Sequence, residues 1–410
     1  MKRVAITGIG AVTPLGNTFE DSWKAALEGC PGIGRISRFD ASGLAWQMAG
    51  EVRGFRPGQY LSRKEVLHHD PFVLYGLAAS AMALKDAALA GGRYVESGGV
   101  IIGSSRGGIS SMEKAILKNT EACRAGRKAR FSPYLMPSST ISAASSFSAQ
   151  KLGLKGHCMG ISNACASGTN AVGEAYRLIK AGYPGPMLAG GTEAPVCWSC
   201  VQGYGAAGAL SDHQDASASR PFDRSRNGFV LAEGAAVMLL EDLDIARKRG
   251  ARVYAEIAGY ACTADAFHIT QPDEEGEARA IRLALEDAAV SAEEVEYISS
   301  HGTSTRLGDR VEAAALRRVF GERTGKVPVS ALKSMTGHML GASGPLEAAF
   351  TAMVLSTGSI PPTINLHEQD EACDLSIVRQ RTEADISLAV SPSFGFGGVN
   401  AVLALKRAAE

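Results

Sequence analysis

The stretch Ile161-Ser-Asn-Ala-Cys165-Ala-Ser-Gly-Thr-Asn170 decides the fold, because it joins a predicted strand to a predicted helix. Residues 156–161 have the short apolar character of a strand. Beyond the stretch, apolar residues recur at helical spacing: Ala171, Val172, Ala175, Leu178 and Ile179. Gly182 then stands where the end of a helix favours a residue with positive φ. Cys165 is therefore expected at a strand-to-helix turn, close to the N-terminus of the helix.

This position predicts a reactive thiol. Free backbone N–H groups and the positive end of the helix dipole favour the thiolate, and both are expected to lower the pKa of Cys165. The small neighbours Ala164, Ala166, Ser167 and Gly168 leave room for a substrate. The stretch alone leaves two interpretations open, a catalytic nucleophile or a buried structural cysteine.

Strand and helix patterns alternate along the rest of the chain. Strands are expected at 98–103, 187–191, 231–240, 252–260, 295–299, 327–331 and 399–405, and helices at 19–27, 71–90, 277–290, 309–320 and 343–357. This alternation predicts a layered α/β protein with a mostly parallel sheet. The best boundary is Gly250, which divides the chain into residues 1–250 and 251–410.

Two histidines follow predicted strands in the second part. His301 follows the strand at 295–300, and His338 follows the strand at 327–330 with Lys333 in the same turn. Ligands of open α/β sheets collect at the carboxyl ends of strands, so Cys165 and both histidines are expected to share a cleft. One histidine suffices to activate a thiol. A second is useful where an enolate develops, because two neutral imidazoles can donate N–H hydrogen bonds to its oxygen.

The composition excludes several classes of protein. Among 410 residues, 42 are Lys or Arg and 42 are Asp or Glu, so no nucleic-acid footprint is indicated. No apolar run is long enough to span a membrane, and the first ten residues do not resemble a signal peptide. Eight scattered cysteines predict a reduced, cytoplasmic protein. Cys197 and Cys200 have no second pair at zinc spacing, so no metal site is expected.

A basic segment leaves a further choice open. Arg124, Arg127, Lys128 and Arg130 lie within residues 121–135, which have no clean periodicity. They form either a solvated loop or a docking patch for an acidic partner.

Five blocks, in order along the chain, carry a resemblance to a known family. They are Asn163-Ala-Cys-Ala-Ser-Gly168, Asn227-Gly-Phe-Val-Leu-Ala-Glu-Gly234, His301-Gly-Thr-Ser-Thr305, Lys333-Ser-Met-Thr-Gly-His338 and Ser393-Phe-Gly-Phe-Gly-Gly398. The chain resembles the β-ketoacyl-[acyl carrier protein] synthases, most closely the elongating enzymes of dissociated (type II) systems. The resemblance implies a thiolase-like fold, in which two similar βαβαβ halves form a layered αβαβα sandwich. It places the nucleophile in residues 1–250 and the two histidines in residues 251–410.

The resemblance also implies an activity. An acyl group moves from a carrier protein to the cysteine, malonyl-carrier protein loses CO2, and the carbanion attacks the acyl-cysteine. The enzyme itself binds no cofactor, because its substrates are carried on the phosphopantetheine of acyl carrier protein. Its partners are that carrier protein and a second subunit, in a homodimer or in a heterodimer with a related ketosynthase-like chain.

Roles for individual residues follow from the matching blocks. Cys165 is the expected nucleophile, His301 and His338 serve decarboxylation, and Lys333 positions the site and pairs with Glu312. The expected substrate-binding residues are Thr303 and Thr305 for the phosphopantetheine arm, and also Phe229, Phe396, Glu312 and Arg106. The backbone N–H groups of Cys165 and Phe396 form the oxyanion hole, and Phe396 acts as a gate because glycines flank it.

Arg106 is a departure from the family pattern, which has a small or aliphatic residue at the base of the acyl pocket. An arginine there shortens the pocket, favours a polar or polyene-like chain, or pairs with an acidic group at the subunit interface. Leu67, His68 and Gly208 stand where related enzymes often carry basic residues.

Two other functions remain as alternatives. One is a non-catalytic partner subunit that shapes a chain-length tunnel, although such partners lack the cysteine. The other is a cysteine hydrolase or a thiolase. The second histidine and Lys333 argue against a hydrolase, and the absence of a cysteine in the block 393–398 argues against a thiolase.

Overall fold

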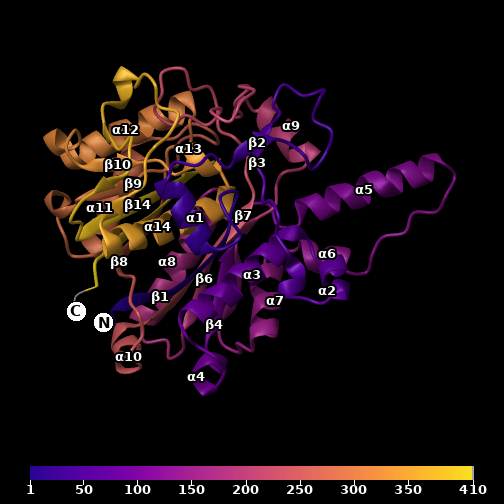
Figure 1. Cartoon of the computed structure of the whole chain (residues 1–410), viewed down its shortest axis with the longest axis horizontal. Coiled ribbons are helices and arrows are strands. Elements are labelled where there is room, and N and C mark those ends of the chain that lie inside the picture. The colour runs from indigo at the N-terminus through magenta and orange to yellow at the C-terminus, as the bar shows by residue number, and fades with distance from the viewer. Residues whose placement is uncertain (409–410) are drawn as a thin grey trace.

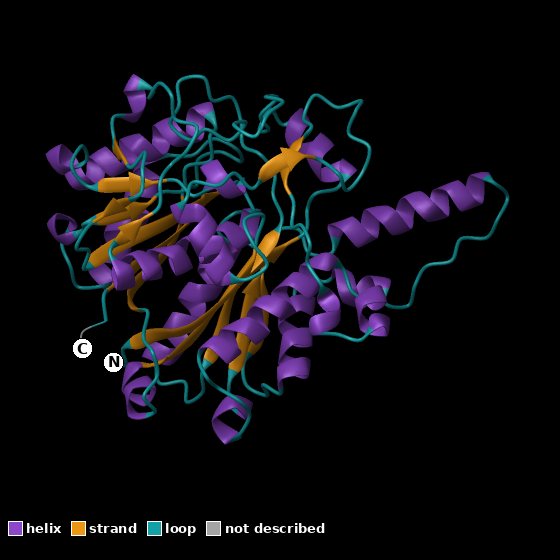
Figure 2. Cartoon of the chain, in the orientation of Figure 1, coloured by secondary structure: helices purple, strands orange, loops and turns teal. Residues whose placement is uncertain are grey.

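The computed structural model describes residues 1–408, and its central feature is an eleven-stranded sheet with helices around it (Figures 1 and 2). The first part of the chain supplies β1 (Val4–Val12), β4 (Gly99–Gly103), β5 (Cys158–Ile161), β6 (Met187–Glu193) and β7 (Gly234–Asp242). The second supplies β8 (Ala255–Ala264), β9 (Tyr297–Ser299), β10 (Pro328–Ser330), β12 (Ser376–Ile377), β14 (Leu388–Gly395) and β15 (Val399–Lys406). The order is β12-β10-β9-β14-β15-β8-β1-β7-β6-β4-β5, so the two sets of strands meet where β8 pairs with β1.

Helices form three layers around these strands. α8 (Ser167–Lys180) and α14 (Ser343–Thr357) are central, and their side chains share one apolar core with residues of β1, β6, β7, β8 and β15. α3 (Pro71–Asp86) and α7 (Ala143–Leu152) cover the outer face of the first set of strands. α11 (Glu274–Asp287) and α12 (Arg306–Phe320) cover the outer face of the second. The expected α-β-α-β-α layering is therefore present.

The remaining helices and two small ribbons complete the fold. The helices are α1 (Phe19–Leu27), α2 (Arg63–His68), α4 (Arg93–Glu96), α5 (Ile109–Arg124), α6 (Leu135–Ser139), α9 (Trp198–Ala206), α10 (Leu243–Lys248) and α13 (Lys333–Thr336). Two small ribbons pair β2 (Ile33–Arg35) with β3 (Met48–Gly50), and β11 (Ser359–Ile360) with β13 (Thr382–Glu383).

Local sequence accounts for the placement of the buried helices. α3 begins where the side chain of Asp70 accepts a hydrogen bond from the backbone N–H of Phe72, with Pro71 at the first helical position. Most of its residues are apolar and buried, as expected of a helix enclosed by other elements. α14 is similarly buried and ends at Gly358, whose φ of +77° is left-handed.

The prediction of a mostly parallel sheet is wrong. The five pairings from β14 through β15, β8, β1 and β7 to β6 are antiparallel, and only the two outer groups of strands are parallel. The block Ser393–Gly398 is part of the reason, because it connects two antiparallel neighbours in the sheet. Ser393 and Gly395 belong to β14, and a turn of three residues, 396–398, returns the chain antiparallel into β15.

One helix projects away from the body of the molecule. α5 extends outward, and the connection after it returns to α6 (Figure 1). α5 ends at Arg124, so part of the predicted loop at 121–135 is helical, while Arg127, Lys128 and Arg130 lie exposed in the connection. Within residues 1–408, no helix has the length and apolar character needed to cross a membrane.

Candidate active site

Cys165 lies on a sharp turn between β5 and α8. Ala164 adopts a φ of +46°, a left-handed conformation that only a closely supported turn retains in a residue with a side chain. The backbone N–H of Asn163 donates to Ser167 Oγ at 2.8 Å, which closes the turn. A Cβ atom on Gly103 of β4 would lie 2.3 Å from the carbonyl of Ser167, so only glycine permits this close approach.

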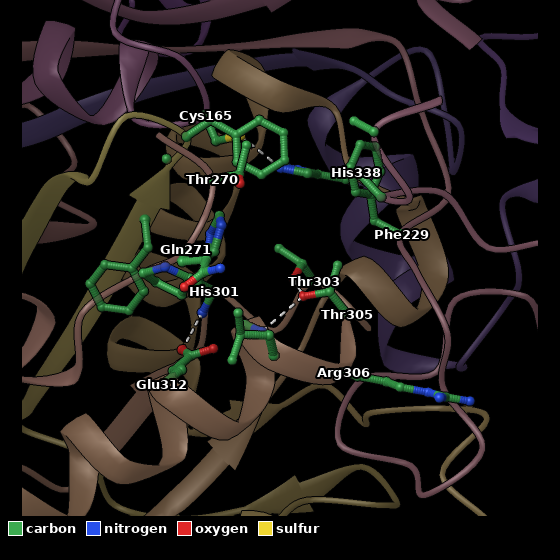
Figure 3. A pocket seen from close by; sticks show the side chains of 18 of the residues that line it. Cys165, Phe229, Thr270, Gln271, His301, Thr303, Thr305, Arg306, Glu312 and His338 are labelled. Carbon is green, nitrogen blue, oxygen red and sulfur yellow. Dashed lines mark hydrogen bonds between the residues drawn. The ribbon is translucent and has the colours of Figure 1, made fainter. Parts of the chain in front are cut away.

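His338 lies directly against the nucleophile. Its Nε2 is 3.1 Å from Cys165 Sγ (Figure 3). Its Nδ1 is 3.1 Å from Ser343 Oγ. Ser343 Oγ already accepts a hydrogen bond from the backbone N–H of Met339, so its own hydrogen is free to donate to Nδ1. This network assigns the imidazole hydrogen to Nε2, which makes His338 an N–H donor beside the sulfur.

His301 is oriented by Lys333. Lys333 Nζ lies 3.3 Å from His301 Nδ1 and also donates to the carbonyl oxygen of His301. An ammonium group can only donate, so Nδ1 accepts, and the imidazole hydrogen of His301 resides on Nε2. The rings of His301 and His338 meet edge to face with centroids 5.4 Å apart, so the two imidazoles border one space.

The prediction that Lys333 pairs with Glu312 is wrong. Lys333 Nζ lies 2.5 Å from Glu347 Oε1, and both side chains are buried. Glu312 instead accepts hydrogen bonds from the backbone N–H groups of His301 and Gly302 at 2.6 and 2.7 Å. The difference arises from packing, because Glu347 belongs to the central helix α14 whereas Glu312 belongs to the outer helix α12. Glu312 thus supports the turn that carries His301.

Burial overrides the predicted effect of the helix N-terminus on the thiol. It raises the pKa of Cys165 to about 11, although the Lys333 charge and a hydrogen bond from the Phe396 backbone act in the opposite direction. The expectation of a lowered pKa is therefore wrong for the unliganded site. Burial, together with the Lys333 charge, also holds the pKa of both His301 and His338 well below the usual value for histidine. At neutral pH the site contains a thiol and two neutral imidazoles.

The predicted backbone donors are brought together. The Phe396 backbone N–H hydrogen-bonds to Cys165. A Cβ atom on Gly395 would lie 3.2 Å from the backbone nitrogen of Cys165, so the two main chains are adjacent. The backbone of Phe396 therefore lies beside that of Cys165, as an oxyanion hole built from these two N–H groups requires.

A cleft of about 660 Å³ lies in front of these groups. Eight of the predicted residues line it: Cys165, Phe229, His301, Thr303, Thr305, Glu312, His338 and Phe396. The hydroxyls of Thr303 and Thr305 are 3.0 Å apart, and Phe229 packs edge-on against His338 at 5.2 Å (Figure 3). Lys333 lies behind His301 and does not line the cleft.

Phe396 is 37% exposed at the tip of the turn between β14 and β15. Gly397 and Gly398 have left-handed φ values of +90° and +66°. The turn is held by two backbone hydrogen bonds of 2.7 Å, from Gly397 N–H to the Ile269 carbonyl and from Asp265 N–H to the Gly398 carbonyl. Phe396 therefore lies between the solvent and the thiol on a turn anchored to a neighbouring loop.

Arg106 does not line the cleft but contacts Tyr204, which does. It lies in the turn between β4 and α5, and its Nε donates to Tyr204 Oη at 2.8 Å. The guanidinium carbon is 5.1 Å from the centroid of the Tyr204 ring. Tyr204 itself lines the cleft and packs against Phe229 with centroids 5.4 Å apart. Tyr204 was not among the predicted site residues, because its helix α9 contains Gly203 and Gly205 and lacks a clear period.

Cys197 and Cys200 are buried at the start of α9, and all eight cysteines are free. Among residues 1–408, no group of three or more His, Cys, Asp or Glu side chains has an arrangement that could hold a metal ion.

Comparison with known proteins places this site in a family. The family model described as beta-ketoacyl synthase, N-terminal domain, matches residues 1–246, and the corresponding C-terminal domain matches residues 254–367. A 3-oxoacyl-[acyl-carrier-protein] synthase 2 from Synechocystis sp. is 44% identical, over 99% of this chain and 98% of that protein. The enzyme of the same name from Staphylococcus aureus is 41% identical, over the same shares of the two chains.

Solved structures agree with this result. The ishigamide ketosynthase/chain length factor superposes with a TM-score of 0.93 at 34% identity and covers 100% of both chains. A type II polyketide synthase acyl-carrier protein in complex with its ketosynthase, bound to the hexaketide, gives a TM-score of 0.91 at 32% identity over 99% of this chain and 100% of that one. The expected fold class and family resemblance are confirmed.

Proposed function

The chain belongs to the β-ketoacyl synthase family, and from this premise we propose how its own residues carry out condensation. The reaction joins an acyl group on the enzyme to malonyl-acyl carrier protein and yields β-ketoacyl-acyl carrier protein. The observation that carries the proposal is the contact of His338 Nε2 with Cys165 Sγ at 3.1 Å, beside a second imidazole held neutral by Lys333.

In the first step, the sulfur of Cys165 attacks the thioester carbonyl of an acyl-carrier protein. The thiol proton passes to the departing phosphopantetheine thiolate, and the acyl group becomes bound to the enzyme as a new thioester. The backbone N–H groups of Cys165 and Phe396 donate to the oxyanion during this exchange.

In the second step, the malonyl thioester loses CO2. The electron pair of the broken C–C bond forms an enolate, and the N–H groups of His301 and His338 stabilise its oxygen. The carbanion then attacks the acyl carbon, which forms a new C–C bond and breaks the C–S bond to Cys165. The Cys165 thiolate that leaves takes up a proton from solvent and becomes the thiol again. Thr303 and Thr305, with hydroxyls 3.0 Å apart at the cleft wall, hold the phosphopantetheine arm.

The enzyme requires no cofactor of its own, because phosphopantetheine arrives on the acyl carrier protein. A basic surface supports docking of that acidic partner. Arg63 and Lys64 lie on α2, and His68 at its end stacks on Tyr134 in the connection after α5. That connection carries Arg127, Lys128 and Arg130, all exposed. The patch interpretation of the basic segment is therefore favoured over a merely solvated loop.

We also propose that the chain works as a dimer, with itself or with a related ketosynthase-like chain. β5 forms an open edge of the sheet, and its residues are exposed or half-exposed. Large apolar side chains are exposed on α5 and the segment after it: Ile116, Leu117, Phe131, Tyr134 and Met136. An open strand edge beside such a surface is typical of an interface.

Other parts of the proposal depend on the same premise. We place the division of labour at residue 250, with the nucleophile before it and the histidines after it, and we place the protein in the cytoplasm. The pathway is fatty-acid synthesis or specialised type II polyketide or polyene synthesis. A chain-length-shaping partner subunit, a hydrolase or a thiolase explains less, because none of these needs Cys165 together with both histidines.

The test is to incubate the protein with a panel of acyl-carrier proteins and to measure intact mass. We expect a mass increase equal to the acyl group, mapped by peptide analysis to Cys165, and condensation after malonyl-carrier protein is added. Cys165→Ala should accept no acyl group, whereas Cys262→Ala, at an exposed cysteine of β8, should load normally. Acylation that survives in Cys165→Ala would disprove the assignment.

A further inference from the structure

Glu277 is a buried carboxyl group for which the reaction described above has no use. It lies in the first turn of α11, is 1% exposed and lines the active-site cleft. Its Oε2 is buried and has no hydrogen-bond partner among residues 1–408. A buried polar atom without a partner is costly, so its presence at a catalytic cleft calls for a ligand.

The charged groups that most strongly affect Glu277 are all carboxyls. They are Glu312 and Asp309 on α12, Asp265 after β8, and Asp273 at the start of α11. Each of these neighbours is satisfied by protein donors. Glu312 accepts two backbone N–H groups, Asp265 accepts from Asn400 and Asp273, Asp273 accepts from Gly276, and Asp309 accepts from Phe222, Ser304 and Arg226.

Glu277 therefore differs from the other carboxyls of this group, because it lines the cleft and has a buried oxygen without a hydrogen-bond partner among residues 1–408. Burial, followed by the charge of Glu312, raises the pKa of Glu277 well above its usual value. At neutral pH the group carries its proton, and a protonated carboxyl is a hydrogen-bond donor. It lies in the first turn of a helix of fourteen residues, where the dipole favours a negative ligand.

We propose that Glu277, as a carboxylic acid, binds the carboxylate of the malonyl extender unit in the cleft. This inference rests on the proposed condensation, in which malonyl-carrier protein must bring a carboxylate close to His301. Lys333 is not available to that carboxylate, because it is engaged by Glu347 and by the His301 carbonyl. A neutral carboxyl supplies a donor without the repulsion that an ionised Glu277 would exert.

Two substitutions separate the hydrogen bond that Glu277 donates from the charge that it carries when ionised. Glu277→Gln keeps an N–H donor that cannot ionise, and Glu277→Leu removes the donor. The matched control is Glu275→Gln, because Glu275 is exposed on the same helix and pairs with Arg282 at the surface. The assays are the rate at which Cys165 is acylated, and the KM and kcat for malonyl-pantetheine in condensation, between pH 6 and 10.

In Glu277→Leu we expect the KM for the malonyl substrate to rise about tenfold or more, the effect of losing one charge-assisted hydrogen bond, while the acylation rate is unchanged. Glu277→Gln should stay close to the wild type at pH 7. As pH rises, the wild-type KM should increase because Glu277 ionises, whereas that of Glu277→Gln should not. Thermal melting should show that both variants are folded. Glu277→Leu should be at least as stable as the wild type, because the substitution removes a buried oxygen that has no hydrogen-bond partner.

Three results would overturn the inference. An unchanged KM for the malonyl substrate in Glu277→Leu would show that Glu277 does not bind the malonyl carboxylate. A parallel loss of acylation, condensation and melting temperature would indicate a structural role only. Potassium or ammonium stimulation that disappears in Glu277→Leu, with the malonyl KM unchanged, would indicate a cation site instead. A wild type that is not acylated and does not condense would refute the proposed function itself, an outcome that is distinct from these three.

Discussion

At the scale of single residues, the chemistry of the site depends on which nitrogen of each histidine carries a hydrogen. Buried Lys333 fixes one histidine tautomer through Nδ1, and Ser343 fixes the other. Glu347 compensates the buried ammonium, which would otherwise be too costly to retain. Among residues 1–408, the sulfur of Cys165 forms no hydrogen bond with a carboxylate or a cation, and its side-chain partner is His338.

This arrangement predicts that the Cys165 thiol reacts slowly with electrophiles at neutral pH. Because burial raises the pKa of Cys165 to about 11, the fraction of thiolate should be small at pH 7 and should increase toward pH 11. Alkylation of Cys165 by iodoacetamide, followed by peptide mass, should accelerate roughly tenfold per pH unit across this range. A rate already at its plateau at pH 7 would show that the thiolate is stabilised in the free enzyme.

His338 should act chiefly after acylation. Its Nε2 carries a hydrogen, so it is poised to donate to the enolate oxygen. His338→Ala should still accept an acyl group but should release CO2 from malonyl-carrier protein on the order of 10²-fold more slowly, the usual loss for one oxyanion donor. His367→Ala, at an exposed site, serves as the control. Undiminished CO2 release in His338→Ala would refute this role.

At the scale of elements, the decisive feature is the turn from β14 to β15. It places the Phe396 backbone against Cys165 and the Phe396 ring at the mouth of the cleft. Its glycines adopt left-handed conformations, and two backbone hydrogen bonds tie it to the loop that contains Asp265 and Ile269. A turn with few side-chain contacts, held by a small number of hydrogen bonds, can open without disturbing the sheet.

Phe396 is accordingly predicted to gate access. Phe396→Ala should change the preference among acyl chain lengths, or the order in which substrates bind, because the ring no longer separates the thiol from solvent. The backbone donor remains, so the melting temperature should stay within a few degrees of the wild type. Initial-rate kinetics with a series of acyl-carrier proteins provide the measurement, with Leu283→Ala on the outer surface as the control. Identical kinetics for every chain length would exclude a gate.

At the scale of the whole molecule, the cleft is connected to the surface that projects with α5. Arg106 stands at the base of that helix and, through Tyr204 and Phe229, contacts the wall around His338. Among residues 1–408, no carboxylate forms an ion pair with Arg106. Its remaining N–H donors are therefore available to a polar acyl chain or to a second subunit.

Arg106→Ile distinguishes these possibilities. If the guanidinium limits the acyl pocket, the variant should accept longer saturated chains, because the polar end of the pocket becomes apolar. If Arg106 anchors an interface, sedimentation velocity should show a weaker dimer. The control is Arg93→Ile, on the distant helix α4. Wild-type chain selectivity together with an unchanged dimer mass would mean that Arg106 serves neither purpose.

The sequence by itself determined the features that depend on local periodicity and on residue type. The helical spacing after Asn170 located α8 and therefore the turn that carries Cys165. Predicted strand ends located His301 and His338, and the ordered blocks identified the family. Each predicted element is encoded within a window of about 11–18 residues, so its prediction needs no information from distant parts of the chain.

Only the tertiary structure decided which groups touch. Glu347 rather than Glu312 pairs with Lys333, because the packing of α14 and α12 selects between two glutamates that the sequence presents alike. The raised pKa of Cys165 reflects burial by segments far apart in the chain, which the local sequence around the cysteine does not show. Tyr204 and Glu277 reach the cleft for the same reason: their neighbours come from other elements, and spacing along one element cannot show which side chains the folded layers bring together.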